Sequence, residues 1–137
     1  FDVVGIDNNM RRYFFGAGAS VDWNTKRLEK NLSRYTHMDF DIRDEDTLAR
    51  TFSRYGKSIE LIVHCAAQPS HDWAAKEPLT DYSINSTGTA NLLEINQICF
   101  SIEPHPFVAT KKFLWLFQMV SDLEPIERPL WLSVCLR

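Results

Sequence analysis

Apolar and polar positions along the chain follow two patterns, one typical of strands and one typical of helices. Residues 1–6 and 59–65 are almost entirely apolar and rich in β-branched side chains, as strands covered on both faces are. In residues 36–42 apolar and polar side chains alternate, which also predicts a strand. A further apolar run occupies residues 105–110. We therefore expect three strands and the start of a fourth.

Segments with helical spacing separate these strands. Residues 23–32 are rich in helix formers. An apolar stripe follows the acidic residues 44–46 and stops at Gly56, as expected for a helix that begins beside negative charge and ends at glycine. Residues 80–99 repeat apolar or small residues at spacings of three and four, which predicts a longer helix. Residues 8–18 contain glycines and no clear period, and we expect a loop there.

The alternation of strands with helices indicates right-handed βαβ units and a parallel sheet. We predict an α/β fold with a partial doubly wound parallel sheet of the Rossmann-like kind over residues 1–97. Residues 98–137 contain clustered aromatic residues, late prolines and no clear period. We treat this segment as a divergent tail of uncertain structure.

Composition and charge narrow the classes of function. The net charge is −3 and no long run of one sign occurs, whereas proteins that bind nucleic acid are usually basic. Three separated cysteines without CxxC spacing argue against a disulfide framework and against a zinc site. The most apolar stretch, residues 113–120, is much shorter than the ~20 residues of a membrane helix. We expect a cytoplasmic protein with no metal, nucleic-acid or membrane partner.

The residues directly after the predicted strands are the candidates for chemistry, because a doubly wound sheet binds ligands beyond the carboxyl ends of its strands. Asp7 ends the first apolar run. An acidic residue at that place accepts hydrogen bonds from the adenosine ribose of NAD. Arg11 and Arg12 keep NADP open as an alternative, and a plain surface turn at Asp7 is a third reading.

Four segments resemble one enzyme family. They read VVGIDN, DFDIRD, VHCAAQPS and NSTGTANLLE, and they lie within residues 1–97. In their order and spacing they resemble the extended short-chain dehydrogenase/reductases, the group of NAD-dependent nucleotide-sugar epimerases and dehydratases. The resemblance implies NAD as cofactor, a nucleotide sugar as substrate and a homo-oligomeric parent enzyme. Within the group the segments are most similar to epimerases of CDP-sugars, so a CDP-sugar is the expected substrate.

The resemblance also implies cofactor contacts for the residues that follow the three strands. Asp7 would bind the adenosine ribose, with Asn8 beside it. Asp41 would hold the adenine amino group, and Ile42 would close over the ring. The small residues Ala66 and Ala67, followed by Gln68, would pass beneath the pyrophosphate and ribose of the cofactor.

Other positions carry weaker implications. Ser70 and His71 would face the substrate, although a polar loop that leads into a helix explains them equally well. Asn85 resembles a helix asparagine that braces the loop of the active site, which is a structural role. Thr110 could correspond to a hydroxyl that assists catalysis.

Two expected elements of the family are not found in the sequence. A Gly-rich phosphate loop should precede Asp7 by about 20 residues, and the GAGAS stretch at residues 16–20 follows it instead. The catalytic YxxxK pair is absent, because no tyrosine is followed four positions later by a lysine. We therefore expect an incomplete piece of an NAD-dependent epimerase that is inactive as this chain alone. The alternative is a small non-catalytic module that keeps part of a dinucleotide fold for binding or interaction.

Overall fold

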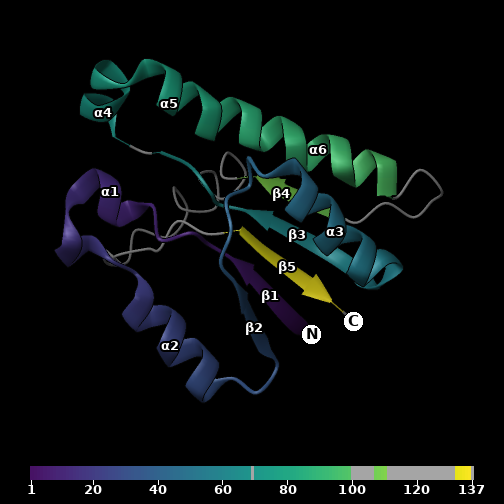
Figure 1. The fold of residues 1–137 in the computed structure, drawn as a ribbon. Helices are drawn as coiled ribbons and strands as arrows, with labels where there is room; N and C mark the ends of the chain where they lie inside the picture. The colour runs from purple at the N-terminus through teal and green to yellow at the C-terminus, as the bar shows by residue number, and fades with distance from the viewer. Residues whose placement is uncertain (69, 100–106, 111–131, 137) are drawn as a thin grey trace, which may run out of the picture.

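A computed structural model describes residues 1–68, 70–99, 107–110 and 132–136. The described strands form one sheet in the order β2-β1-β5-β3-β4. They are β1 (Asp2–Ile6), β2 (Tyr35–Met38), β3 (Ile59–His64), β4 (Phe107–Thr110) and β5 (Leu132–Leu136). Figure 1 shows β1, β5 and β3 side by side in the middle of the molecule, with helices around them.

Three of the described helices have ten or more residues, and the other three are short. In chain order the helices are α1 (Arg11–Phe15), α2 (Asp22–Asn31), α3 (Glu45–Tyr55), α4 (His71–Lys76), α5 (Pro78–Tyr82) and α6 (Gly88–Cys99). Single 3₁₀ turns occupy Ala17–Ala19 and Gly56–Ser58, and a π turn over Ser83–Thr87 joins α5 to α6. In Figure 1 the helices α4, α5 and α6 follow one another along one side of the sheet.

Two pairs of strands are parallel, in agreement with the parallel arrangement predicted from the sequence. Strand β1 pairs with β2 in parallel, and β3 pairs with β4 in parallel. The predicted strands over residues 1–6 and 59–65 are therefore present, as is the predicted α/β class. The strand predicted over residues 36–42 is wrong at its end, because β2 stops at Met38. Strand β2 lies at the edge of the described sheet beside β1, and its pairing ends where the last residue of β1, Ile6, lies opposite Met38. Farther along, the Asp41 carboxylate accepts the backbone N–H of Arg43 at 2.9 Å and forms a side-chain turn.

The central strand β5 was not predicted. It runs antiparallel to both of its neighbours, β1 and β3, so the sheet is mixed and not purely parallel. In the common doubly wound order the place beside these two strands belongs to a parallel strand. Both β4 and β5 come from the segment that we separated as a tail after residue 97. That domain boundary stays a prediction.

The helices begin and end for local reasons. Helix α3 starts where the Asp44 carboxylate accepts the backbone N–H of Thr47 at 3.0 Å, which is an N-cap. It ends at Gly56, whose φ of 48° lies in a region that L side chains rarely adopt.

The loop predicted for residues 8–18 is wrong in part, because α1 and a 3₁₀ turn lie in it. Helix α1 buries Phe14, whose ring lies 5.5 Å from that of Trp73, so a tertiary contact stabilises it.

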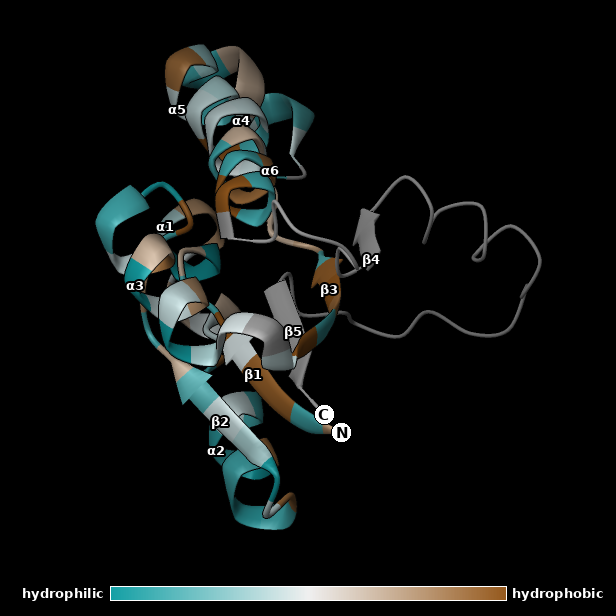
Figure 2. Ribbon diagram, turned by 90° about the vertical axis from the view of Figure 1, so that its right-hand side faces the viewer, coloured by the Kyte–Doolittle hydropathy of each residue, from teal (hydrophilic) through white to brown (hydrophobic). Residues whose placement is uncertain are grey.

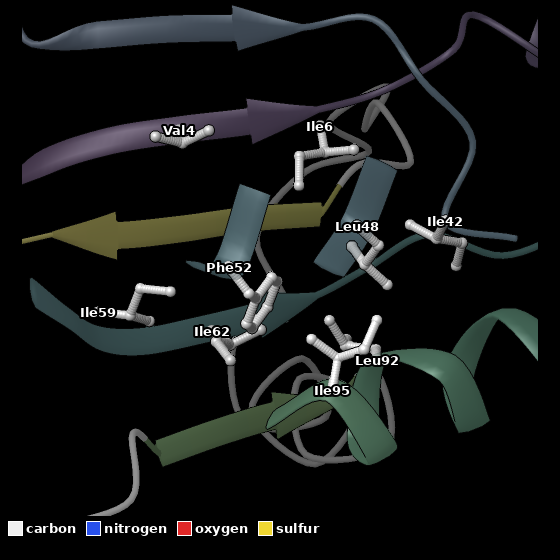
Figure 3. Packing of buried hydrophobic residues seen from close by; sticks show 9 residues of the cluster. All are labelled: Val4, Ile6, Ile42, Leu48, Phe52, Ile59, Ile62, Leu92 and Ile95. Carbon is white, nitrogen blue, oxygen red and sulfur yellow. The ribbon is translucent and has the colours of Figure 1, made fainter. Parts of the chain in front are cut away.

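Helices α3 and α6 share the hydrophobic core with strands β1 and β3 (Figure 3). The buried cluster comprises Val4, Ile6, Ile42, Leu48, Phe52, Ile59, Ile62, Leu92 and Ile95. In Figure 2 hydrophobic colour marks β1, β3 and parts of α5 and α6, whereas α2 is mostly hydrophilic. Gly88 lets α6 approach this core, because a Cβ there would lie 2.5 Å from Cδ1 of Ile42. The core thus fixes residue 42 directly beside the start of α6.

Candidate functional site

A pocket lies beyond the carboxyl ends of β1 and β3 and beside the segment that follows β2. It brings together most of the residues that the sequence assigned to the cofactor. They are Asp7, Asn8, Asp41, Ile42, Ala66 and Ala67. Helix α1 borders the same pocket through Arg11, Phe14 and Phe15. Gln68, Ser70, His71 and Asn85 do not line it.

Asp7 presents a partly buried carboxylate to this pocket. Its Oδ1 accepts the backbone N–H of Asn9 at 2.6 Å. Among the described residues no other hydrogen bond and no ion pair to this carboxylate occurs. Burial raises the pKa of the Asp7 carboxyl, and the carboxylates of Asp39 and Asp22 add to the rise, against the Asn9 bond and His37, which lower it. A desolvated carboxylate with a free oxygen is suited to accept hydroxyl groups from a ligand.

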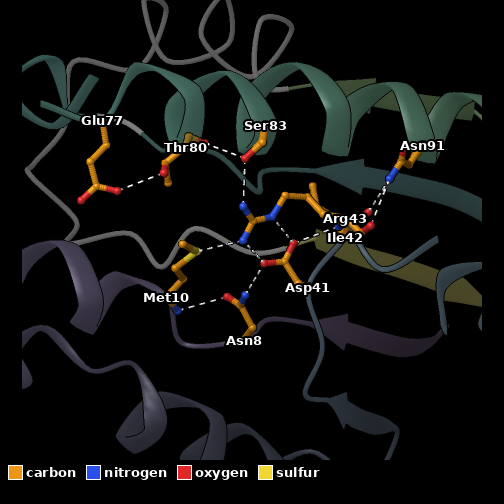
Figure 4. Close-up of polar contacts among 9 residues, drawn as sticks. All are labelled: Asn8, Met10, Asp41, Ile42, Arg43, Glu77, Thr80, Ser83 and Asn91. Carbon is orange, nitrogen blue, oxygen red and sulfur yellow. Dashed lines mark hydrogen bonds and ion pairs between the residues drawn. The ribbon is translucent and has the colours of Figure 1, made fainter. Parts of the chain in front are cut away.

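Asp41 is in the opposite situation, because its acceptor sites are already used (Figure 4). Its Oδ1 accepts the backbone N–H and Nε of Arg43, each at 2.9 Å. Its Oδ2 accepts from Arg43 NH2 at 2.7 Å and from Asn8 Nδ2 at 2.8 Å. Burial alone would raise the pKa of Asp41, but the bonds from Arg43 and Asn8 outweigh it and the pKa is lowered. An adenine amino group would therefore have to replace one of these donors.

Arg43 joins three segments around the pocket, and the sequence reasoning missed it. Besides Asp41, its guanidinium donates to Ser83 Oγ at 2.9 Å and contacts Met10 Sδ at 3.7 Å. The side chain of Asn91 on α6 contacts the backbone carbonyls of Ile42 and Arg43 at 3.4 and 3.5 Å. Figure 4 shows the loops after β1 and β2 meeting the α5–α6 helical segment at this guanidinium. The available signal was the Asp-x-Arg spacing, which suits a local carboxylate–guanidinium pair.

The loop after β3 is held by Asn85. The Asn85 side chain accepts the backbone N–H of Gln68 at 2.8 Å and donates to the Gln68 carbonyl at 3.1 Å. Asn85 lies in the π turn Ser83–Thr87, a distortion that often occurs at functional sites. Ser70 caps α4 by accepting the N–H of Trp73, and His71 is exposed at the start of that helix. The substrate role of Ser70 and His71 stays a prediction.

Thr110, the candidate catalytic hydroxyl, is the last residue of β4. Its backbone is paired in register with His64 at the end of β3. This register places it at the same end of the sheet as the pocket, because β3 and β4 are parallel. Its catalytic role is a prediction that the geometry leaves untested.

A cluster of aromatic side chains connects α1 to α4, and no sequence pattern predicted it. The ring of Trp73 lies 5.8 Å from that of Tyr13 and 5.5 Å from that of Phe14. The Tyr13 hydroxyl donates to the carboxylate of Glu77 at 2.9 Å. These contacts hold the helix that borders the pocket against the segment that follows β3.

His64 is buried at the end of β3 and forms one side-chain hydrogen bond with the residues that the structure describes. The hydroxyl of Thr89 donates to the Asn85 carbonyl at 2.7 Å, so it accepts from His64 Nε2 at 2.9 Å. This assignment leaves Nδ1 of His64 as a buried acceptor without a partner. Burial lowers the pKa of His64.

We predict that acid destabilises the protein through His64. The unfolded histidine binds a proton near pH 6.5, whereas the folded one resists protonation until a lower pH. The unfolded state therefore binds more protons in that interval, and the free energy of unfolding falls as the pH drops below about 6.5. Urea unfolding at pH 7.5 and pH 5.5 measures the loss, and His64→Gln, which keeps a donor for Thr89 but does not titrate, should show a smaller one. An equal loss in both proteins would contradict the assignment.

The described residues contain neither a candidate metal-binding cluster nor a helix suited to span a membrane. Within residues 1–68, 70–99 and the two short described strands, no group of three or more His, Cys, Asp or Glu side chains could hold a metal ion. None of the helices described there has the length and apolar character needed to cross a membrane.

Known proteins are similar to this chain over most of its length. Residues 2–110 match the NAD dependent epimerase/dehydratase family. Human UDP-glucose 4-epimerase is 32% identical over 82 residues, which cover 59% of this chain and 23% of that protein. An uncharacterized protein of Methanocaldococcus jannaschii is 30% identical over 92 residues, which cover 67% of this chain and 26% of that protein.

The similarity has a clear limit in length. UDP-glucose 4-epimerase of Pongo abelii is 30% identical over 82 residues, again 59% of this chain and 23% of that protein. The chain thus spans about a quarter of the length of the curated relatives that it matches. No solved structure matches it significantly. Because the family match extends over residues 2–110, well beyond half of the sequence, the chain belongs to the NAD-dependent epimerase/dehydratase family.

Proposed function

We propose that this chain binds the adenosine half of NAD and is the corresponding part of a nucleotide-sugar epimerase. The observation that carries the proposal is the pocket beyond β1 and β3, which is lined by Asp7, Asp41 and the small residues Ala66 and Ala67. The family match is consistent with NAD as the cofactor. When bound in a complete enzyme, NAD would supply reversible hydride transfer at a sugar carbon.

The chemistry of the pocket fits an adenosine ribose. The free oxygen of Asp7 can accept the hydrogen bonds that adjacent ribose hydroxyls donate. Ala66 and Ala67 at the pocket wall leave room for a ligand to approach the backbone. Asn8 lies beside Asp7, and its Nδ2 donates a hydrogen bond to Asp41. A ligand that contacts Asp7 would therefore also meet Asn8, the hydrogen-bond partner of Asp41.

The nature of the nucleotide sugar is a finer proposal. Two of the similar proteins are UDP-glucose 4-epimerases, which supports a nucleotide sugar in general. The segments DNNMRRYFFG and INSTGTANLLE resemble CDP-paratose 2-epimerase, and on this resemblance we propose a CDP-sugar that is epimerised at C2. The parent enzyme would act as a homo-oligomer in the cytoplasm.

We expect Asp7→Ala to weaken the binding of NAD by about 1–3 kcal/mol, the usual range for hydrogen bonds that involve a charged group. Calorimetric titration of the 137-residue chain with NAD measures the effect. The change should not reduce stability, because it removes a carboxylate whose burial opposes ionisation. Asp46→Ala, at an exposed carboxylate in the first turn of α3, is the matched control. Equal NAD affinity in Asp7→Ala and the parent chain would exclude Asp7 as a ribose ligand.

A non-catalytic binding module is the second candidate function. It is favoured by the absence of a YxxxK pair from these residues, since that pair supplies the base of the family reaction. Both hypotheses predict that the chain binds NAD, and they differ in whether the chain is part of a catalytic protein. We expect no interconversion of CDP-paratose and CDP-tyvelose by this chain, and turnover that a single substitution in the pocket abolishes would establish an enzyme.

A further inference from the structure

Arg43 lies outside the lining of the pocket, yet it contacts lining residues from two segments. Its guanidinium donates from Nε to Oδ1 of Asp41 at 2.9 Å and from Nη2 to Oδ2 at 2.7 Å, the two-pronged geometry in which arginine matches a carboxylate. Nη2 also contacts Met10 Sδ at 3.7 Å. Asp41 and Met10 line the pocket and Arg43 does not, so Arg43 supports the pocket wall without being part of it.

The hydrogen bonds that the described residues donate to the Asp41 carboxylate come from two differently placed residues. Three come from the backbone N–H, Nε and Nη2 of Arg43, and one comes from Asn8 Nδ2. Asn8 lines the pocket, so its bond is the one that a ligand in the pocket can replace. When a donor of the ligand takes the place of Asn8, the three bonds from Arg43 remain and keep the carboxylate where it is.

The guanidinium is itself fixed by the segment that contains α5 and α6. Arg43 Nη1 donates to Ser83 Oγ at 2.9 Å, and the Ser83 hydroxyl donates to the Thr80 carbonyl at 2.9 Å. At the other end of the residue, Asn91 Nδ2 contacts the backbone carbonyl of Arg43 at 3.5 Å. Figure 4 shows the Arg43 guanidinium between Asp41 and Ser83. Both ends of residue 43 are therefore held by helical residues that do not line the pocket.

Charge favours the same arrangement. Burial would raise the pKa of Asp41, but the hydrogen bonds and the charge of Arg43, together with Asn8, lower it. Other charged side chains of the surrounding segments each have a partner elsewhere, namely Asp7, Arg11, Asp44, Glu77 and Asp81. Arg43 therefore keeps a half-buried carboxylate ionised and ready to accept a hydrogen bond.

We propose that Arg43 is a positioning residue of this pocket: braced by Ser83, it holds the Asp41 carboxylate at a fixed place and angle, so that the carboxylate accepts the exocyclic amino group of an adenine. The inference rests on the proposed binding of adenosine. Arg43 acts through Asp41 and makes no contact with the ligand. Its removal should therefore change the preference for an amino group, and not the binding of nucleotides in general.

The test compares two nucleotides that differ in the amino group of the base, AMP and purine riboside 5′-monophosphate. Calorimetry on the full chain at pH 7.5 gives the ratio of their dissociation constants. We expect the parent chain to prefer AMP. In Arg43→Met the affinity for AMP should fall about tenfold, whereas the affinity for the purine nucleotide should change less than about twofold, because only AMP has an amino group to donate to Asp41.

Arg34→Met is the matched control. Arg34 forms the same kind of pair with Asp2, from Nε to Oδ1 at 2.9 Å and from Nη2 to Oδ2 at 3.1 Å. This pair lies at the start of β1, and both of its side chains are more exposed than those of Arg43 and Asp41. Neither nucleotide should bind with changed affinity in Arg34→Met. Circular dichroism checks that each variant is folded.

Two further variants separate geometry from charge. Arg43→Lys keeps a positive charge but not the two-pronged geometry, so it should restore only part of the preference for AMP. Ser83→Ala removes the brace and leaves the ion pair, and it should cause a smaller loss of preference than Arg43→Met. Titration of the Asp41 carboxyl carbon by NMR gives a readout without ligand. The pKa of Asp41 should rise in Arg43→Met, where burial meets less opposition, and stay at the parent value in Ser83→Ala.

The outcomes distinguish this inference from the proposed function. If neither nucleotide binds the parent chain, both are overturned. If AMP binds and the ratio in Arg43→Met equals that of the parent chain, whether because neither affinity changes or because both fall equally, the positioning role is overturned and the adenosine site stands. Full recovery of the preference in Arg43→Lys would assign the effect to charge alone and would also overturn the positioning role.

Discussion

Phe52→Ala is expected to lower the free energy of unfolding by about 3–5 kcal/mol, the range for the removal of a buried aromatic side chain. Phe52 is fully buried in α3 and packs in the cluster that joins α3 and α6 to β1 and β3. Figure 3 shows its ring lying close to Ile62. A loss of this size is a large share of the stability of a small domain. Denaturation in urea, with matched slopes for the two proteins, measures it.

Phe52→Leu is the matched control. It keeps most of the apolar volume and should cost only about 1–1.5 kcal/mol. If Phe52→Ala and Phe52→Leu lose the same small amount, the core around α3 is not packed as described. Because Phe52 lies outside the pocket lining, ligand binding by the folded fraction of either variant should be unchanged.

Val134→Pro is expected to have the second large effect. It should lower the free energy of unfolding by at least about 3 kcal/mol. Val134 is paired with Val4 on one side and with Ile62 on the other. Proline removes a backbone donor from a central strand, leaves an acceptor in a neighbouring strand unmet and adds steric conflict. We expect loss of the cooperative unfolding transition or a sharp drop in its midpoint.

The control for the backbone effect is Val134→Ala, which keeps the N–H. It should retain a cooperative transition at a clearly higher midpoint than the proline variant. The same stability in Val134→Pro and in the parent chain would show that residues 132–136 do not form the central strand. Hydrogen exchange at Val4 and Ile62 gives an independent measure, because their amides should lose protection in the proline variant.

Local pattern was enough to predict β1, β3 and the three longer helices α2, α3 and α6. Apolar runs marked β1 and β3, and the stripe that ends at Gly56 marked α3, because burial on one or both faces leaves a direct trace in the sequence. The predicted end of β2 was wrong, because the alternating pattern continues to residue 42 whereas the partner strand β1 ends opposite Met38. The central strand β5 was not predicted, because its pairing with β1 and β3 is a contact between distant parts of the chain that local pattern does not indicate.

Topology alone was enough to predict that residues after different strands lie at one edge of the sheet, and their roles in binding stay predictions. Asp7, Asp41 and Ala66 each follow a strand, and strands that run the same way end at the same edge. The sequence could not predict which hydrogen-bond partners these side chains have. The ion pair of Arg43 with Asp41 and the hydrogen bonds between Asn9 and residues 20–22 depend on distances that sequence spacing does not provide.

The position of β5 also sets the order in which the protein can fold. Strands β1 and β2 can pair early, and β3 and β4 can pair separately, but Val4 must wait for Val134 before the two halves join. Contacts between such distant parts of a chain slow folding. A ribosome that adds about 5–20 residues per second needs roughly one to four seconds to proceed from Thr110 at the end of β4 to Leu132 at the start of β5. During that interval the inner edges of β1 and β3 lack the strand that pairs with both of them, and an unpaired strand edge is a template for association with other chains.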